Sequence, residues 1–290
     1  MQALALSAVK AVSETVHSGP VSTAVTEGML QTQLAERIKI PTLPREIAPG
    51  TFWFGCCLEV HQPDKILHNH NASYLLIGSE ATVLVDTGMP YGWANLRSEL
   101  QTVLNGRPLD YVFPTHPEAP HMGNIGPLLE LYPGMKIVGD LRNYHLYYPH
   151  AQDRFVTMRA DESLELGGRR LQAVTAVIHD IPNTLWGYEP DQRILFVSDA
   201  YPYTHEHETH QCGMTSEELP AEIRPEDTST VIGFALNWVR HVDPDITMER
   251  LNAFLDRHPV DIIAPAHGGV VTNPKVVTRV FEQGMRRVRN

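Results

Sequence analysis

Four apolar stretches of this sequence are followed by residues whose side chains can bind a metal ion. "YVF" (111–113) leads into "THPEAPHMGN" (115–124), "RILFVSDA" (193–200) contains an aspartate near its end, and "VDIIAPAH" (260–267) ends in a histidine. A fourth stretch reaches Ile178 and is followed by His179. Short apolar runs of this kind predict buried strands. Because strand ends hold side chains rigidly, the pattern predicts a polar site along one rim of a sheet.

The candidate donors include both imidazole and carboxylate groups. They are His116, Glu118, His121, His179, Asp199 and His267. A single histidine after a strand is most often an ordinary core or capping residue. Donors that follow four separate strands are much harder to explain in that way, and the 15 histidines of the chain also point to metal chemistry. The sequence therefore predicts a metal site.

The order of the predicted elements indicates an α/β fold. Strands are expected at 51–60, 72–78, 81–88, 111–114, 135–140, 162–178, 193–200 and 260–269, the sixth range being a hairpin around Gly167 and Gly168. Helices are expected at 92–104, 125–132, 228–242, 246–258 and 273–288. Strand pairs early and late in the chain, with helices between and after them, predict an α/β/β/α sandwich of two mixed sheets flanked by helices.

Residues 1–47 are expected to form an N-terminal helical extension or arm, and residues 48–290 a single domain. The extension has apolar residues at roughly helical spacing and ends in the proline-rich "PTLPREIAPG". It could cover a pocket or lie on a neighbouring subunit of a homo-oligomer, and a partly ordered leader is the alternative.

The composition of the chain limits the classes of molecule and the cell compartment that we expect for it. The formal net charge of −11 argues against nucleic-acid binding. No apolar run reaches the ~18 residues that a membrane helix needs, and the N-terminus does not read as a signal peptide. Three cysteines, two of them adjacent, fit a reducing compartment without a disulfide framework. We therefore expect a cytoplasmic protein.

The series of strand-end donors resembles the metallo-β-lactamase superfamily from about residue 50 to the C-terminus. That superfamily's usual motif is His-x-His-x-Asp-His, and "VDTG" (85–88) is similar to its early strand, with Asp86 as the buried support residue. "HPEAPHMGN" resembles more specifically the His-x-Glu-x-Asp-His motif of flavodiiron proteins and related oxygen-binding di-iron proteins. The resemblance implies the α/β/β/α fold and a dinuclear iron site.

Carried over residue by residue, the resemblance implies three groups of ligands. One metal would take His116, Glu118 and His179, the other would take His121 and His267, and Asp199 would bridge them. The motif's aspartate is replaced by Pro120, which has no donor side chain. The second metal could then have an open coordination position, a residue elsewhere could fill it, or the protein could bind a single metal.

Other polar and aromatic residues are weaker candidates. His205, Tyr201, Tyr203 and Trp186 are near the proposed ligands in sequence and could line a pocket, although the aromatic residues could equally belong to the core. His68 and His70 are expected in a loop at the active-site face, with an ordinary surface loop as the favoured interpretation. Cys56 and Cys57 are interpreted as small strand residues.

Three functions remain open, and the first is favoured. It is a non-heme di-iron oxidoreductase that activates O2 against a small organic substrate, with electrons from that substrate or from a separate donor. Glu118 favours two iron ions over zinc at this site. We expect no flavodoxin domain of the kind that flavodiiron proteins carry, because the sequence ends soon after the last predicted helix and shows no phosphate-binding glycine loop. The alternatives are a di-iron O2 or NO sensor without turnover, and a zinc-dependent hydrolase of an ester, lactone or thioester.

Overall fold

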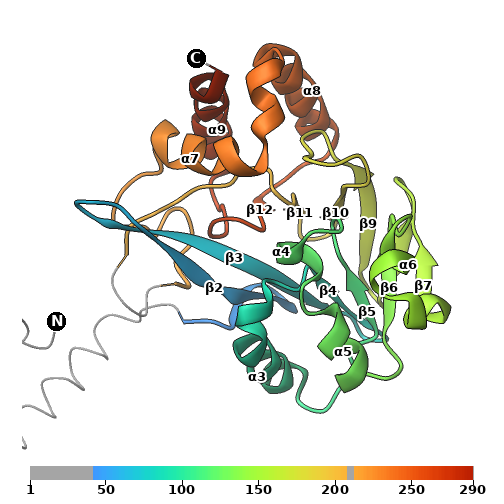
Figure 1. Cartoon of the computed structure of the whole chain (residues 1–290). Coiled ribbons are helices and arrows are strands. Elements are labelled where there is room, and N and C mark those ends of the chain that lie inside the picture. The colour runs from blue at the N-terminus through green and yellow to red at the C-terminus, as the bar shows by residue number, and fades with distance from the viewer. Residues whose placement is uncertain (1–41, 208–211, 290) are drawn as a thin grey trace, which may run out of the picture. The chain divides into compact units, whose positions relative to one another are not determined.

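Two β-sheets lie between layers of helices in the computed structural model, which describes residues 42–207 and 212–289 (Figure 1). The larger sheet has seven strands in the spatial order β1 to β7. They are β1 (Arg45–Ala48), β2 (Thr51–His61), β3 (Ile66–Ile77), β4 (Thr82–Val85), β5 (Tyr111–Phe113), β6 (Lys136–Gly139) and β7 (Phe155–Thr157). Strands β1 to β4 pair antiparallel and β4 to β7 pair parallel, so the sheet is mixed.

The smaller sheet has five strands in the order β12-β11-β10-β9-β8. They are β8 (Ser163–Glu165), β9 (Arg170–Thr175), β10 (Leu185–Glu189), β11 (Ile194–Phe196) and β12 (Ile262–Ala264). Only β11 and β12 pair parallel in this sheet, and the other pairs are antiparallel.

The helices of the described residues are mostly short near the site and longer at the C-terminal end. The α-helices are α3 (Trp93–Leu104), α4 (Ala119–Met122), α5 (Ile125–Leu131), α6 (Tyr144–Tyr147), α7 (Pro225–Ala235), α8 (Pro244–Arg257) and α9 (Pro274–Arg289). Short 3-10 helices are η1 (Pro90–Gly92), η2 (Pro149–Arg154) and η3 (Asn237–His241).

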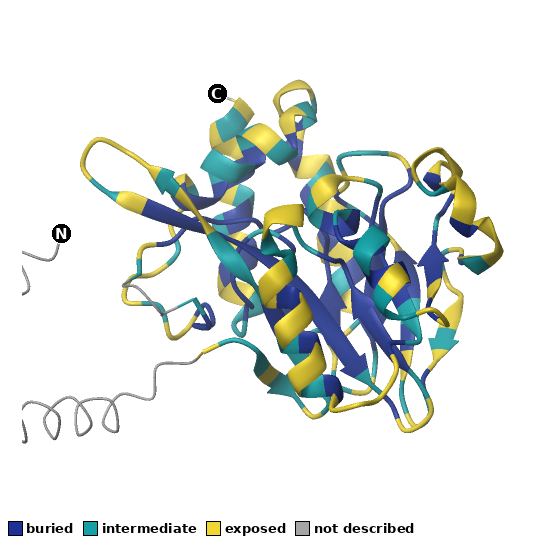
Figure 2. Cartoon of the chain, turned by 60° about the horizontal axis from the view of Figure 1, so that its bottom comes forward, coloured by how far each residue is buried: buried dark blue, intermediate teal, exposed yellow. Residues whose placement is uncertain are grey.

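Three apolar clusters establish the layer order. One lies between the larger sheet and helices α3 and α5, and includes Leu84, Leu100 and Leu128. A second lies between the two sheets, and a third joins the smaller sheet to α7, α8 and α9. Figure 2 shows the resulting buried strands inside a shell of exposed helix faces. The predicted α/β/β/α sandwich is confirmed.

Strands β2 and β3 form a long antiparallel hairpin whose far end projects beyond the rest of the sheet (Figure 1). Strand β3 begins at Ile66, well before residue 72, where the sequence pattern predicts the strand to start. His68 and His70 lie inside β3 and are buried, so their expected position in a surface loop is wrong. The polar residues of "HNHNAS" (68–73) are buried because two loops contact this part of the strand. The loop that follows β11 pairs with His68 through His205, and the loop that follows β12 hydrogen-bonds to the backbones of His70 and Ala72.

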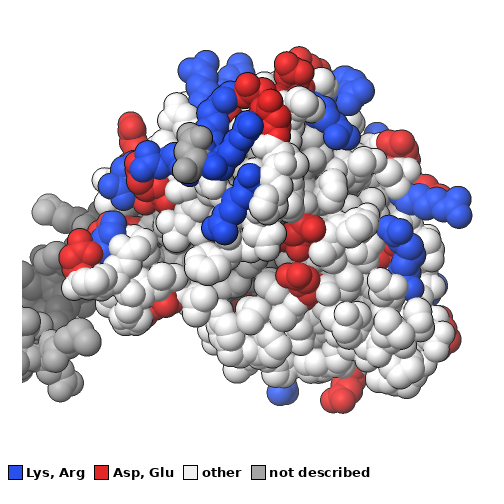
Figure 3. Space-filling view, turned by 45° about the horizontal axis from the view of Figure 1, so that its top comes forward, with Lys and Arg blue, Asp and Glu red and all other residues white. Residues whose placement is uncertain are grey.

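The C-terminal helices are tied together by ion pairs across their exposed faces. Arg286 of α9 contacts Asp245 of α8, and Arg287 Nη2 lies 2.8 Å from Glu226 Oε1 of α7. Figure 3 shows Lys and Arg side chains beside Asp and Glu over this end of the molecule. None of the helices in the described residues is long and apolar enough to cross a membrane.

Most of the expected N-terminal extension lies outside the described residues. The predicted helices near its start and near residue 34 belong to that part of the chain. The described chain enters the larger sheet at β1, which pairs with β2 from Arg45 onward. The sheet therefore begins three residues before residue 48, the expected start of the domain.

Candidate metal centre

The donors come together because their strands point the same way within each sheet. His116 follows β5, and the loops after β9, β11 and β12 carry Asp180, Asp199 and His267. Strand β9 is antiparallel to β10, which is antiparallel to β11, and β11 is parallel to β12. The three strands of the smaller sheet therefore end at one edge, which is where a site on such a sheet is built.

Asp199 is the centre of the cluster. Its Oδ1 lies 3.2 Å from His121 Nε2 and 3.0 Å from His267 Nε2. Its Oδ2 lies 3.5 Å from His116 Nε2. The two oxygens of one buried carboxylate thus face two different sets of donors, which is the arrangement expected of a bridging ligand.

One ring nitrogen of His116 is buried and has no hydrogen-bond partner. The atom is Nε2, and three carboxylates surround it. The nearest oxygens are Asp180 Oδ2 and Asp199 Oδ2 at 3.5 Å, and Glu118 Oε2 at 3.9 Å. Buried polar atoms without a partner are rare, because each costs about 1–3 kcal/mol. A cation between these groups would satisfy the nitrogen and balance the carboxylates.

The outer nitrogens of His116 and His121 are held by residues behind them. His121 Nδ1 lies 3.0 Å from Asp86 Oδ2, and His116 Nδ1 lies 2.9 Å from Ser198 Oγ. Asp86 is itself fixed by Thr115, whose backbone N–H donates to Oδ1 at 2.8 Å. Metal-binding histidines are usually oriented by such contacts to the second ring nitrogen. Both rings therefore present Nε2 toward the centre.

The backbone on either side of the site is held in unusual conformations. Asp86 and Ser198 have φ values of 56° and 54°, in the left-handed region that residues other than glycine rarely adopt. Strain of this kind persists only where surrounding contacts enforce it, and it collects at functional sites. Gly268, directly after His267, has φ 118°, and a Cβ there would approach Tyr203 to 2.8 Å.

The charges of the cluster are strongly coupled. Burial alone would lower the pKa of His121, but the carboxylates of Asp86 and Asp199 raise it well above its usual range. Burial would raise the pKa of Asp199, but His121 and His267 hold it well below its usual range. For Asp180, burial is the largest influence and raises the pKa, with a further contribution from Asp199. Asp199 therefore favours its ionised form, whereas the pKa of Asp180 is raised because it is buried beside other carboxylates.

Asp180, and not His179, lies at the position that the resemblance implies for His179. The structure does not bring His179 into the cluster: it is exposed, and its ring lies near Trp238, with centroids 6.2 Å apart. The next residue, Asp180, takes that place with Oδ2 3.5 Å from His116 Nε2. The sequence contained the signal, because "VIHD" offers two adjacent donors and only one can point inward from an extended loop.

Glu118 and Pro120 lie at the start of the one-turn helix α4. Glu118 is the residue that precedes the helix, and its side chain is half exposed at the edge of the cluster. Pro120 stands in the first turn, where a missing N–H costs no helical hydrogen bond. His121, one residue later, is fully buried and points to Asp199. Pro120 therefore removes a donor without disturbing the helix that positions His121.

The residues predicted to line a pocket do not do so. Trp186, Tyr201 and Tyr203 are fully buried in the apolar core, where Tyr201 stacks on Phe281 with centroids 4.8 Å apart. Burying large aromatic rings stabilises the fold, and the core interpretation applies to all three. His205 is buried beside His68 and His207 in a separate cluster of histidine and cysteine residues. It therefore belongs to that cluster and not to a pocket at the metal centre.

The donor set fits two metal ions. One side has His116, Glu118 and Asp180, the other has His121 and His267, and Asp199 lies between them. Mixed imidazole and carboxylate donors suit iron, manganese or zinc, and two imidazoles with one carboxylate are typical of non-heme iron sites with open positions. No cysteine belongs to this set.

Comparison with known proteins agrees with the fold. The sequence model of the metallo-β-lactamase superfamily matches residues 69–267. A nitric oxide reductase of Moorella thermoacetica is 26% identical over 168 residues, which cover 54% of this chain and 42% of the relative. A coenzyme F420H2 oxidase of Methanothermobacter marburgensis is 23% identical over 261 residues, which cover 82% of this chain and 60% of the relative. The chain thus spans about two fifths to three fifths of these relatives.

Solved structures show the same fold at lower sequence identity. Rubredoxin oxygen:oxidoreductase from Desulfovibrio gigas has a TM-score of 0.68 and 16% identity, over 84% of this chain and 61% of that one. A fragment of a putative diflavin flavoprotein from Nostoc has a TM-score of 0.66 and 19% identity, over 86% of this chain and 97% of the fragment. The chain therefore belongs to the metallo-β-lactamase superfamily and is similar to flavodiiron proteins within it.

Proposed function

We propose that this protein is a di-iron oxidoreductase that binds and reduces O2, with electrons supplied by a separate donor or by a small organic substrate. The relatives named as an oxidase and as a nitric oxide reductase support the reaction class, although the chain spans only part of their length. O2 and NO are both small ligands that an open iron site can accept, and O2 is the one we assign here.

The observation that carries the proposal is the position of Asp199 between two unlike sets of donors. His121 and His267 face its Oδ1, and together with Asp199 they make the two-imidazole, one-carboxylate set with open positions. His116 and Asp180 lie on the side of Oδ2, with Glu118 at the edge. When bound, the pair of iron ions would supply the electron-transfer chemistry that no side chain of this cluster can supply.

The protein's own residues would hold the geometry and the charge. Asp86 and Ser198 fix the rings of His121 and His116 from behind, and the buried Thr115 connects the two supports. Glu118, half exposed at the edge of the site, is the group placed to exchange protons with solvent.

The carboxylate count matches the motif that the chain resembles. Pro120 removes a carboxylate beside His121, and Asp180 adds one beside His116. Three carboxylates remain in the set, but all three now lie on or bridge to the first side. We infer that the first metal is the more tightly held and that the second, with only His121, His267 and Asp199, is the one open to O2.

O2 consumption by iron-loaded protein tests this proposal. The chain is loaded anaerobically with Fe²⁺, reduced with dithionite, freed of excess reductant and mixed with buffer containing O2. We expect rapid O2 uptake with a change in the near-ultraviolet absorption of the iron centre, and loss of both in His121→Ala. Adding candidate organic reductants in a second series distinguishes a substrate from a separate electron donor.

The matched control is His179→Ala, which changes an exposed histidine next to the site and should consume O2 like the unmodified protein. Protein grown with ample iron that contains only zinc and takes up no O2 would overturn the proposal. Cleavage of model esters or lactones by that zinc protein would support a hydrolase instead. A stable oxygenated spectrum without electron uptake would make the protein an O2 sensor.

A further inference from the structure

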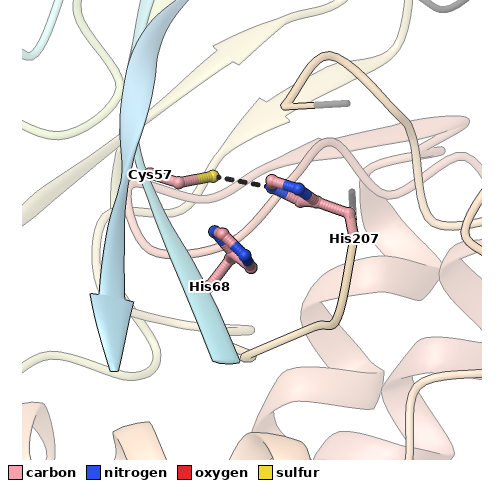
Figure 4. A group of neighbouring side chains, drawn as sticks. All are labelled: Cys57, His68 and His207. Carbon is pink, nitrogen blue, oxygen red and sulfur yellow. Dashed lines mark hydrogen bonds between the residues drawn. The ribbon is translucent and has the colours of Figure 1, made fainter. Parts of the chain in front are cut away.

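A second cluster of metal-binding side chains lies at the base of the projecting hairpin. Cys57 comes from β2 and His68 from β3, on neighbouring strands whose register pairs Cys57 with His70 and Glu59 with His68. His207 comes from the loop that follows β11. Figure 4 shows the sulfur of Cys57 and the two imidazoles turned toward one another. Donor atoms of these three residues all lie within 4.8 Å of one another.

The distances are close to those of a tetrahedral metal site. Cys57 Sγ lies 3.3 Å from His207 Nε2, and the rings of His68 and His207 stack with centroids 3.8 Å apart. A zinc ion with Zn–S and Zn–N bonds of about 2.3 and 2.0 Å holds its sulfur and nitrogen ligands about 3.6 Å apart. The sulfur of Cys57 and the nitrogen of His207 are therefore spaced as two ligands of one zinc ion would be.

Cys212 supplies a fourth donor from the same loop region. It lies beside both Cys57 and His207, and we take it as the candidate for the fourth ligand. The cluster then contains two sulfurs and two imidazoles, which is the donor set of many closed, structural zinc sites. The combination of two soft sulfurs with imidazole favours zinc over iron, magnesium or calcium.

An unsatisfied buried nitrogen points to a ligand at this position. His68 is 9% exposed, and its Nδ1 is buried without a hydrogen-bond partner. The neighbouring His70 is completely buried and holds Cys57 from behind, with Nδ1 3.5 Å from Sγ and Nε2 3.4 Å from the carbonyl oxygen of Phe54. A ligand side chain supported in this way is typical of a built metal site.

We propose that Cys57, His68, His207 and Cys212 bind one zinc ion in a structural site that is separate from the dinuclear centre. The site would fasten the β2–β3 hairpin to the loop that follows Asp199. That loop is already hydrogen-bonded to β3 through the backbones of His68 and His205. Residue 70 of the same strand also accepts a hydrogen bond from Gly268, next to His267. Zinc binding would therefore hold two of the loops that carry ligands of the dinuclear centre.

Cobalt titration of the full chain tests this site alone. Metal-free protein, reduced and then freed of thiol reagents, is titrated with Co²⁺, and the near-ultraviolet charge-transfer band of thiolate-bound cobalt is recorded. The dinuclear centre has no cysteine among its donors and gives no such band. We expect the band to appear and saturate with an intensity that corresponds to one thiolate-bound Co²⁺ per chain, and Zn²⁺ to abolish it.

Variants at adjacent cysteines supply the control. Cys57→Ser and Cys212→Ser should each lose most of the band, and His207→Gln should weaken cobalt binding by at least tenfold. Cys56→Ser should keep the band, because Cys56 belongs to the same strand but is not in the cluster. Zinc should also raise the melting temperature of the unmodified protein and of Cys56→Ser by more than that of Cys57→Ser, in which only the dinuclear centre can bind it.

Two results would overturn the proposal. The first is a band that is absent in the unmodified protein or unchanged in Cys57→Ser. The second is a disulfide between Cys57 and Cys212 in freshly purified protein that persists in reductant and prevents cobalt binding. Neither result bears on O2 consumption at the dinuclear centre, so the two proposals fail separately.

Discussion

Asp86 shows how a single residue can control a metal position that it does not touch. Its carboxylate receives the backbone N–H of Thr115 on one oxygen and faces His121 Nδ1 with the other. The N–H of Thr115 determines that Oδ1 of Asp86 faces Thr115 and that Oδ2 faces His121. The tautomer of His121 therefore depends on Asp86 having an acceptor, and not a donor, at Oδ2.

We predict that Asp86→Asn lowers the affinity of the second metal by about 10- to 100-fold. The amide oxygen would stay on the N–H of Thr115, so the NH2 group would face His121 Nδ1 and move the ring proton to Nε2. Isothermal titration of metal-free protein with Fe²⁺ measures the change. Asp110→Asn is the control, since Asp110 accepts a hydrogen bond from Thr82 N but touches no donor of the site. Equal affinities in Asp86→Asn and the unmodified protein would contradict this role.

Glu99 of α3 gives a pH-dependent prediction. Burial raises the pKa of Glu99 to about 7, although a hydrogen bond with the backbone of Gly55 opposes the shift. Because the pKa of Glu99 is raised in the folded protein, its ionisation has no effect on the free energy of unfolding below the unfolded pKa near 4.5. The free energy of unfolding falls as the pH rises from there, and the full loss is reached above about pH 7. The shift corresponds to about 3 kcal/mol, which screening of this partly exposed group reduces to about 1–2 kcal/mol.

Glu99→Gln should therefore raise the free energy of unfolding by about 1–2 kcal/mol at pH 8 and leave it unchanged at pH 4.5. Denaturant unfolding at the two pH values measures the difference. Glu130→Gln, on the exposed face of α5, should change stability little at either pH. A gain of equal size at both pH values in Glu99→Gln would show that ionisation of Glu99 is not the cause.

At the scale of elements, the contact between α7 and α9 depends on the absence of one side chain. A Cβ on Gly284 of α9 would lie 1.8 Å from Oγ1 of Thr228 on α7. Thr228 cannot move freely, because it is buried and Oγ1 donates a hydrogen bond to the carbonyl oxygen of Pro225. The two helices approach closely only because position 284 is glycine.

Gly284→Ala should therefore destabilise the protein by about 1–3 kcal/mol through overpacking. Gly126→Ala in α5 is the matched comparison, because nothing lies within 4 Å of its Cβ position. That change should stabilise by up to about 1 kcal/mol, since alanine loses less backbone entropy than glycine in a helix. Melting temperatures of the two variants should move in opposite directions, and a shift of both in the same direction would contradict the packing argument.

Strand and helix positions were largely predictable from sequence where the apolar pattern was strong. The helix around Leu96 and Leu100, the hairpin at Gly167 and the strands that precede Asp199 and His267 occur as predicted. The start of β3 was not predictable, because His68 to Asn71 are polar and become buried through contact with the distant loops at His205 and His267. Short edge strands such as β7 carry too few residues for a periodic signal.

At the scale of the whole molecule, the sequence predicts which strands carry the site but not which side chains point into it. Strand polarity in the two sheets explains why the loops after β5, β9, β11 and β12 converge. The choice between His179 and Asp180 depends on the exact turn after β9, which no spacing rule determines. The cysteine and histidine cluster was also missed, because Cys57, His68 and His207 are joined only by the fold.

The arrangement of carboxylates over the whole site explains how the site tolerates Pro120. Asp180 restores a carboxylate on the opposite side of Asp199, so the charge available to two divalent ions is retained while its distribution changes. The net charge of −11 does not locate the site, because it is spread over a surface on which Arg286, Arg287 and Arg289 of α9 are paired with acidic residues.

The measurement that tests this account most directly is the iron content of two variants at adjacent positions. Asp180→Ala and His179→Ala are produced alongside the unmodified protein, loaded anaerobically with iron, and analysed for iron per chain with thermal unfolding as a check on folding. The account predicts two iron ions in the unmodified protein and in His179→Ala, and about one in Asp180→Ala. Loss of iron in His179→Ala with full retention in Asp180→Ala would contradict it.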